Sequence, residues 1–328
     1  MGYIPKLGLS YMGSKRILAK HIIDHILEKN PNCKYIYDLF GGGGAISFEA
    51  MQRKQIKKVF YNELNTGVVE LLKDFFKNGI TDKYYQWVDR ETFFKNKNED
   101  SWFGGFVKVF YSFGSNQRTY LYNKDIEKYK KNYHNLVVFN KDTIKEMEAF
   151  IEKYVFDKYN VQEKCTLIMP NFNLSIQERR LNIRKQLTMY EKKCKVKQLR
   201  QLQQLEKLQR LERLQQLKFS QKLEILNSSY EDVGITTPKQ ETIIYCDPPY
   251  YNTAQYQKDI DHEVFFEWVK NNPYTTYISS YNAPLYLVNS FNHRSTLSSS
   301  NNSLKTKENL YCNIKEKENT SFFKFPIE

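Results

Sequence analysis

The stretch KYIYDLFGGGGAISFEAMQRK, residues 34–54, decides the fold. Residues 34–40 read as a short buried strand, four glycines follow, and residues 45–54 have the apolar spacing of a helix. A second strand is predicted at 57–63, and a second helix begins at residue 64. Strand, turn, helix and strand in this order open an α/β fold with a parallel sheet.

The elements outside this stretch are predicted from the same patterns. Residues 14–29 carry apolar side chains on one face, which predicts an amphipathic helix capped by Ser14. Near residue 222 the strand pattern returns after a long interval. Strands with loop exits are predicted in 222–233 and 241–250, a helix in 261–272, a strand in 275–282, and closing strands in 309–318 and 321–328.

The chain is long enough for two domains, or for one domain with a large insertion. It has 328 residues, of which 41% are hydrophobic and 27% charged, as in globular proteins. Between residues 67 and 220 the strand and helix alternation fades. We therefore predict a sheet domain formed from 1–66 and 221–328, interrupted by an insertion at 67–220.

The charge of the chain indicates a polyanionic partner. The formal net charge is +13 and the pI about 9.2, and a basic surface attracts phosphate. Residues 178–222 contain 14 Lys and Arg but only 4 Glu. No long apolar span or lipid-anchor pattern occurs, which favours nucleic acid over a membrane. The start MGYIPK lacks the zones of a signal peptide, so we expect a cytoplasmic protein.

Within the basic segment, leucine recurs at every third position from Leu199 to Leu217. Each step turns a helical side chain by about 300°, so the leucines pass around the helix instead of forming one stripe. A coiled coil is therefore disfavoured, and we predict a helix that touches partners on several sides. A DNA-facing basic helix and a low-complexity spacer are both open interpretations.

Cysteine and histidine give no sign of a disulfide framework or a metal site. The five cysteines never fall as C-x-x-C. His21 and His25 have i, i+4 spacing, which is more typical of a helix surface than of a metal site when no other ligand is near.

The glycine run, together with the acid that follows it, predicts an adenosine-containing cofactor, which need not be a dinucleotide. Glycines between a strand and a helix let a ligand approach the backbone at the helix N-terminus. Phe40, Gly42 and Gly44 have the spacing F-x-G-x-G, and Glu63 follows at the end of the next strand, where a carboxylate binds ribose hydroxyls. No G-K-[ST] closes the run, which excludes a P-loop.

The segment CDPPY, residues 246–250, predicts chemistry on an exocyclic amine of a nucleobase. The lone pair of such a nitrogen is delocalised into the ring, and two acceptors aimed at its hydrogens make the nitrogen a nucleophile. The Asp247 carboxylate and the Pro248 carbonyl are these acceptors. Pro248 and Pro249 have fixed φ angles and no N–H. Tyr250, with Tyr251 or Tyr256, offers a stacking face for a base removed from its duplex.

With these motifs in this order, the chain resembles the Dam-like adenine-specific DNA methyltransferases, which use S-adenosylmethionine. YMGSK at 11–15 is similar to their N-terminal cofactor motif, which implies that Tyr11 and Lys15 contact the cofactor. The glycine motif implies the same for Asp38, Phe40, Gly42 and Gly44. YNELN implies ribose binding by Glu63, SYEDV makes Asp232 a further candidate, and CDPPY resembles the catalytic tetrad, with Asp247 also at the cofactor edge.

Two other segments also resemble this family. YSFGSNQRTY, residues 111–120, looks like a segment on the DNA side, and ISSY at 278–281 is compatible with a later strand motif. Tyr11 stands where the best-known members have Trp and Glu63 where they have Asp, and both changes preserve the chemistry. The leucine repeat does not match the usual recognition region, so the target sequence stays open.

The resemblance implies a Rossmann-like sheet with an inserted, mostly helical target-recognition domain. It implies N6 methylation of adenine in double-stranded DNA at specific sites, as in restriction–modification. The sequence leaves the oligomeric state open, and a monomer on DNA is compatible with it; no metal is expected. Four alternatives remain: a cytosine N4 methyltransferase, which more often has Ser in place of Asp247; an RNA adenine methyltransferase; a protein-glutamine methyltransferase, which usually has Asn there; and a catalytically inactive DNA-binding or packaging protein.

Overall fold

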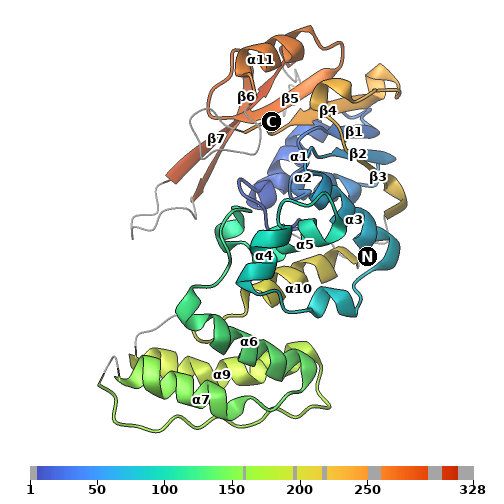
Figure 1. Ribbon diagram of the computed structural model, residues 1–328. Coiled ribbons are helices and arrows are strands. Elements are labelled where there is room, and N and C mark those ends of the chain that lie inside the picture. Colours follow the sequence, from blue (N-terminus) through green and yellow to red (C-terminus); the bar gives the residue numbers. More distant parts are fainter. Residues whose placement is uncertain are drawn as a thin grey trace, which may run out of the picture. The chain divides into compact units, whose positions relative to one another are not determined.

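The computed structural model describes residues 6–157, 160–194, 198–215, 220–249, 260–294 and 305–316. The chain divides into two compact units (Figure 1). We call Met1–Val69 together with Arg213–Glu328 the sheet unit, and Glu70–Glu212 the helical unit. The sheet unit therefore combines two segments that are far apart in the sequence.

Within the described residues, the sheet unit contains one mixed sheet with the strand order β3-β2-β1-β4-β5-β7-β6. The strands from β3 to β5 pair in parallel, whereas β7 is antiparallel to β5 and β6. The predicted α/β class is confirmed. The bounds are Tyr35–Asp38 (β1), Lys58–Asn62 (β2), Leu223–Leu226 (β3), Thr242–Cys246 (β4), Thr275–Ser280 (β5), Tyr286–Arg294 (β6) and Lys305–Cys312 (β7).

The register of the central strands places three exits at one edge of the sheet. Asp38 of β1 pairs with Tyr61 of β2 on one side and with Tyr245 of β4 on the other. The strand order also reverses between β1 and β4. From β1 the chain adds β2 and β3 on one side of the sheet, and it then returns to add β4 and β5 on the other side. Ligands of open α/β sheets bind at the carboxyl ends of the strands at such a point.

Apolar side chains fill the centre of the sheet because helices cover it, as parallel sheets require. All five residues of β4 are buried, and α2 packs against α1, β1 and β2. The helices of the sheet unit are α1 (Ala19–Lys29), α2 (Ala45–Met51) and α11 (His262–Asn271), and α3 (Thr66–Asn78) begins in it and continues into the helical unit.

The prediction of a helix from residue 14 with a Ser14 cap is wrong at its start. Lys15–Ile17 form a short 3-10 turn, and the regular helix begins only at Ala19. The Ser14 hydroxyl caps no backbone N–H and instead accepts a bond from Arg16 Nε at 3.2 Å. The Ser14 hydroxyl is thus bonded to a neighbouring side chain and does not cap the helix.

The strand predictions agree with every described strand except the exposed strand β6. β1 to β5 and β7 lie within or overlap the predicted ranges, but β6 was not predicted. This strand is at the end of the sheet, and its Tyr286 and Leu287 are 53% and 54% exposed, so its sequence lacks the apolar pattern of a buried strand. The predicted closing strand at 321–328 lies outside the described residues.

The described part of the helical unit consists of helices joined by loops and short turns, with one isolated bridge between Ser112 and Tyr120. Aromatic rings fill much of its interior, and Phe106, Tyr111 and Tyr133 are almost fully buried. Its main helices are α4 (Arg90–Asn96), α5 (Trp102–Tyr111), α6 (Lys124–Phe139), α7 (Ile144–Ile151), α9 (Ile176–Cys194) and α10 (Gln203–Gln215), of which α10 runs past the end of the unit.

The leucine repeat belongs to the hydrophobic core. Each leucine from Leu199 to Leu214 is at most 2% exposed, and four of them lie on α10; Leu217 lies outside the described residues. The prediction of a helix that is packed on several sides is therefore confirmed, and the interpretation as a low-complexity spacer is wrong.

Part of the positive charge of the helical unit is internal. The three basic residues concerned are at most 8% exposed, and their side chains donate hydrogen bonds to backbone carbonyls. Burial also lowers the pKa of Lys130 to about 7. These ammonium and guanidinium groups therefore hold loops and helix ends together. They are Lys130, bonded to Leu199 and Gln201; Arg179, bonded to Val137 and Phe172; and Lys207, bonded to Val109 and Ser112.

Leu211→Ala should lower the free energy of unfolding by about 2–5 kcal/mol, because it leaves a cavity where a leucine is fully buried. Urea denaturation followed by circular dichroism measures the change. The matched control is Leu181→Ala on α9, where the leucine is 50% exposed, and it should change stability by less than about 0.5 kcal/mol. Equal effects of the two substitutions would contradict a core role for the repeat.

Candidate functional site

The glycine turn that follows β1, Gly41–Gly44, is shaped by contacts within the protein. Gly44 has φ 73° and is the N-cap residue of α2. A Cβ atom at Gly41 would lie 2.2 Å from the ring of Tyr61, and one at Gly44 would lie 2.4 Å from the ring of Phe48. These two positions therefore require glycine for packing, and Gly44 requires it for its left-handed backbone as well.

The end of β2 holds this turn in place. The Tyr61 hydroxyl donates to the Gly42 carbonyl at 2.7 Å, and the Gly41 N–H donates to the Asn62 carbonyl at 2.7 Å. Glu63 completes the set, because its Oε2 accepts a bond from the Gly42 N–H at 2.8 Å. The N–H and the carbonyl of Gly42 are thus both held, by Glu63 just after β2 and by Tyr61 on β2.

Glu63 also connects the turn to the N-terminal motif. Its Oε1 accepts bonds from the Asn65 N–H at 2.9 Å and from the Tyr11 hydroxyl at 3.4 Å. The carboxylate is only 8% exposed. The structure therefore brings together Tyr11, Gly42 and Glu63, three residues that the sequence assigned to the cofactor.

Asp38, the last residue of β1, binds the first turn of α2. Its Oδ2 accepts bonds from the Ser47 N–H at 3.2 Å and from the Ser47 hydroxyl at 2.7 Å, and the residue is 1% exposed. Burial raises the pKa of this carboxyl to about 7, although the bonds from Ser47 oppose the shift. Asp38 therefore joins strand to helix on either side of the glycine turn.

Two other residues that the sequence assigned to the cofactor take no part in these hydrogen bonds. The Phe40 ring belongs to a hydrophobic cluster and stacks on Tyr230, with 5.4 Å between ring centroids. Asp232 is exposed in the short turn Tyr230–Asp232 that follows β3. Phe40 thus packs in the interior, and Asp232 lies on the surface.

Asp247 follows β4 and pairs with a residue from the opposite end of the sequence. The Lys15 Nζ donates to Asp247 Oδ1 at 2.7 Å. Pro248 is buried and Pro249 is half-buried. The candidate stacking residues Tyr250, Tyr251 and Tyr256 lie outside the described residues.

Lys15 also faces an acid that the sequence did not indicate. Its ammonium lies 3.6 Å from Oε1 of Glu308 on β7. Burial by itself would lower the pKa of Lys15, but Asp247, Glu308 and Tyr281 oppose burial, and the net effect is a raised pKa. No local pattern marks Glu308, because its position depends on the pairing of β7 with β5.

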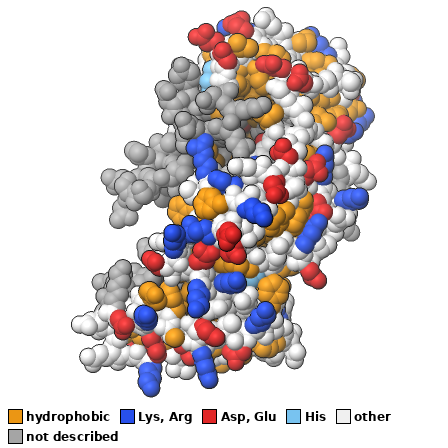
Figure 2. All heavy atoms as spheres, viewed as in Figure 1, with side chains coloured by type: hydrophobic (Ala, Val, Ile, Leu, Met, Phe, Trp, Pro, Cys, Tyr) orange, Lys and Arg blue, Asp and Glu red, His pale blue; other side chains and the backbone are white. Residues whose placement is uncertain are grey.

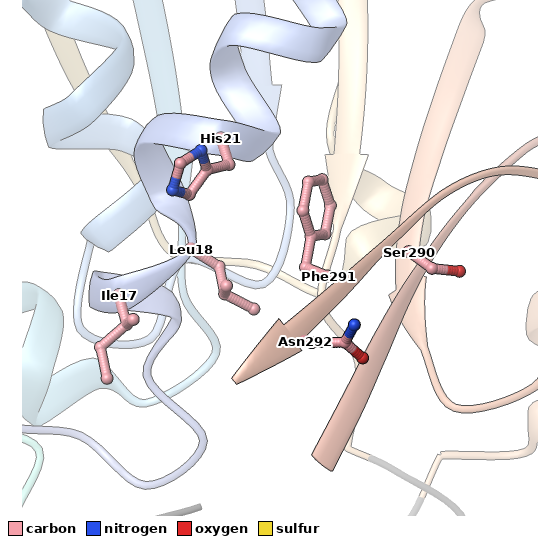
Figure 3. Close-up of a pocket in the computed structure, with 6 residues that line it drawn as sticks. All are labelled: Ile17, Leu18, His21, Ser290, Phe291 and Asn292. Atoms are coloured by element: carbon pink, nitrogen blue, oxygen red, sulfur yellow. The ribbon is translucent and has the colours of Figure 1, made fainter. Parts of the chain in front are cut away.

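The sheet unit also contains a small hollow that is separate from the residues just described. In Figure 3 the His21 ring on α1 and the Phe291 ring on β6 are seen close to each other, and their centroids are 6.4 Å apart. None of the residues predicted for the site lines this hollow. The lining residues are Ile17, Leu18, His21, Ser290, Phe291 and Asn292.

The edge of the sheet thus carries carboxylates at three neighbouring exits: Asp38 ends β1, Glu63 follows β2 and Asp247 follows β4. In the described ranges, no cluster of three or more His, Cys, Asp and Glu could hold a metal ion. No helix in the same ranges is long and apolar enough to cross a membrane.

Residues 11–321 match the family described as D12 class N6 adenine-specific DNA methyltransferases, and the chain belongs to this family. The match spans both segments of the sheet unit and the whole helical unit. No curated protein matches the chain. The protein is therefore an enzyme that methylates N6 of adenine in DNA, and the predicted Dam-like resemblance is confirmed.

Gly44→Ala should lower the free energy of unfolding by about 2 kcal/mol or more, because the new methyl group combines left-handed strain with overlap of the Phe48 ring. Thermal or urea denaturation measures the loss. Gly234→Ala is the matched control, since a Cβ atom there meets nothing within 4 Å. A Gly44→Ala protein as stable as this control would show that the turn tolerates a side chain.

Asp38→Asn should change how stability depends on pH. The pKa of Asp38 in the folded protein, about 7, lies above its ordinary value of 3.8, so the folded state binds a proton that the unfolded state does not. Relative to Asp38→Asn, the parent protein should therefore gain stability as the pH falls from about 7 to about 4, by a few kcal/mol. Urea denaturation of both proteins across this range tests the slope, and parallel curves would contradict it.

Proposed function

We propose that this DNA adenine methyltransferase uses S-adenosylmethionine and acts at the edge of the sheet formed by the exits of β1, β2 and β4. The register of β1 with β4 is the observation that carries the proposal. It pairs Asp38 with Tyr245, so the glycine turn and Asp247 leave neighbouring strands at the same edge. A methyl donor bound at the glycine turn and an adenine amine bound at Asp247 would therefore lie close together, as direct methyl transfer requires.

The residues at this edge suit a cationic cofactor with a ribose. When bound, S-adenosylmethionine would supply a methyl group made electrophilic by a positively charged sulfur. Lys15, Tyr11 and the glycine turn would hold its methionine part, and Glu63 its ribose hydroxyls. Each carboxylate oxygen accepts more than one hydrogen bond, so Glu63 can bind these hydroxyls while it keeps its bonds to Gly42 and Asn65.

Three further residues have supporting roles in this proposal. Asp38 fixes α2 behind the glycine turn through Ser47. Phe40 anchors the beginning of the turn in the hydrophobic cluster. Asp232, on the turn after β3, would lie towards the adenine of the cofactor.

Asp247 and Pro248 would accept the two hydrogens of the target adenine amine. Pairing with an ammonium favours the charged form of a carboxylate, which accepts hydrogen bonds but cannot donate them. The pair with Lys15 at 2.7 Å uses Oδ1. Pro248 has no N–H to compete with its carbonyl. As N6 bonds to the methyl carbon, the bond between that carbon and the cofactor sulfur would break, and one hydrogen of N6 would leave as a proton to water.

The target adenine would leave the duplex to reach these acceptors, because N6 is inaccessible to this chemistry inside stacked double-stranded DNA. Tyr250 would stack on the flipped base, with Tyr251 or Tyr256 as a second face. Stacking and orientation supply much of the rate enhancement in such a site, so no nucleophilic side chain is needed.

The helical unit is our proposed target-recognition domain. Its loop between α5 and α6 exposes Phe113 and Arg118, and Asn116 holds the loop through bonds to Arg118 and Thr119. Phosphate contacts would come from exposed basic side chains such as Lys185 on α9. On the face in Figure 2, Lys and Arg are interspersed with Asp and Glu, so DNA binding would depend on local clusters. We propose a cytoplasmic enzyme that binds DNA as a monomer.

Asp247→Ala should reduce methyl transfer by at least about 100-fold, since it removes an acceptor that acts on the reacting nitrogen. Binding of DNA, measured by filter retention, should stay within about threefold of the parent. Mass spectrometry of digested DNA measures N6-methyladenine directly and distinguishes it from N4-methylcytosine. Glu263→Gln, an exposed acid on α11, is the control and should keep the parent rate. Equal rates for Asp247→Ala and the parent would refute the role of Asp247.

A further inference from the structure

Glu308 is a buried acid that the proposed mechanism does not yet use. It is 3% exposed, and its Oε1 lies 3.6 Å from the Lys15 ammonium. It reaches this position because β7 pairs with β5 and β6. A buried carboxylate is costly unless it is paired, so its place beside Lys15 calls for an explanation.

Two carboxylates face the Lys15 ammonium. Its Nζ donates to Asp247 Oδ1 at 2.7 Å and to the Gly13 carbonyl at 3.4 Å, and Glu308 is the second acid. One carboxylate is enough to neutralise one ammonium. Either of these two acids can therefore serve as the counter-charge of Lys15.

The second carboxylate beside Lys15 has a use when Asp247 binds the adenine amine. A carboxylate that turns towards substrate weakens its bond to Lys15, and a buried ammonium without a partner is strongly unfavourable. Glu308 keeps an acid beside Lys15 throughout. We propose that Glu308 is a positioning residue for methyl transfer, which holds and neutralises Lys15 so that the Asp247 carboxylate can serve the substrate. This inference rests on the role proposed above for Asp247.

The charge of Glu308 should also affect the pH dependence of methyl transfer. The groups that act on Lys15 are Asp247 after β4, Glu308 on β7 and Tyr281 after β5; burial lowers the pKa of Lys15, and these groups raise it by more. In Glu308→Gln one of these raising groups is lost. Lys15 then loses its proton at a lower pH, so the fall in activity on the alkaline side should move to lower pH.

The test compares full-length Glu308→Gln and Glu308→Asp with the parent enzyme on DNA. For Glu308→Gln we expect kcat to fall about 10–100-fold. The KM for DNA and the Kd for S-adenosylmethionine, measured by calorimetry, should stay within about threefold. The alkaline limb of the activity–pH profile should move to lower pH. Glu308→Asp keeps the charge on a shorter side chain. It should lower kcat by less and leave the limb near that of the parent. Glu263→Gln is the control for loss of an exposed acid.

Each outcome decides the question. A Glu308→Gln enzyme with the kcat and pH profile of the parent would overturn the proposal, and so would equal losses in both variants with an unmoved alkaline limb, which indicate a purely structural role. If Glu308→Gln does not fold, Glu308→Asp decides: a kcat close to that of the parent, with the parent limb, supports the proposal because the charge is retained, whereas a large loss of kcat with the parent limb indicates a structural role and overturns it. Absence of adenine methylation by the parent would instead refute the proposed function.

Discussion

The ring of Tyr61 lies so close to the backbone of Gly41 that a single added carbon would overlap it. The site depends on this contact. Because β2 approaches the glycine turn so closely, the Tyr61 hydroxyl can bind the Gly42 carbonyl and the Glu63 carboxylate can bind the Gly42 N–H. The turn then sets the start of α2, and Asp38 secures that start from the other strand. The geometry of the edge is therefore decided by backbone packing before any ligand arrives.

Four buried cations among the described residues differ in their partners. Lys130, Arg179 and Lys207 bind neutral carbonyls and hold loops and helix ends. Lys15 instead lies among acids. A carbonyl partner fixes a cation in one place, whereas a pair of carboxylates lets one acid change partner while the other maintains neutrality. The same residue type thus serves architecture in the helical unit and, in our proposal, chemistry in the sheet unit.

The acids of the edge already have partners in the folded chain: Asp38 binds Ser47, Glu63 binds Gly42, and Asp247 binds Lys15. These bonds orient the carboxylates without using all of their acceptor positions, since each carboxylate has about four lone pairs. Preorganisation of this kind lowers the cost of orienting groups when substrate binds.

The sequence by itself determined the α/β class, the central strands, the family and the motifs at Gly42, Glu63 and Asp247. Buried parallel strands, glycine turns and proline exits leave local patterns, because the backbone requires particular residues there. Only the tertiary structure decided the occupation of the Ser14 hydroxyl by Arg16, the exposed edge strand β6, and the burial of Lys207 and Glu308. The edge strand and the two buried charges depend on contacts between residues far apart in the chain, and contacts of that kind leave no periodic trace in the segments that form them. The Ser14–Arg16 bond is local, but the pattern of a serine before a helix does not show which donor its hydroxyl binds.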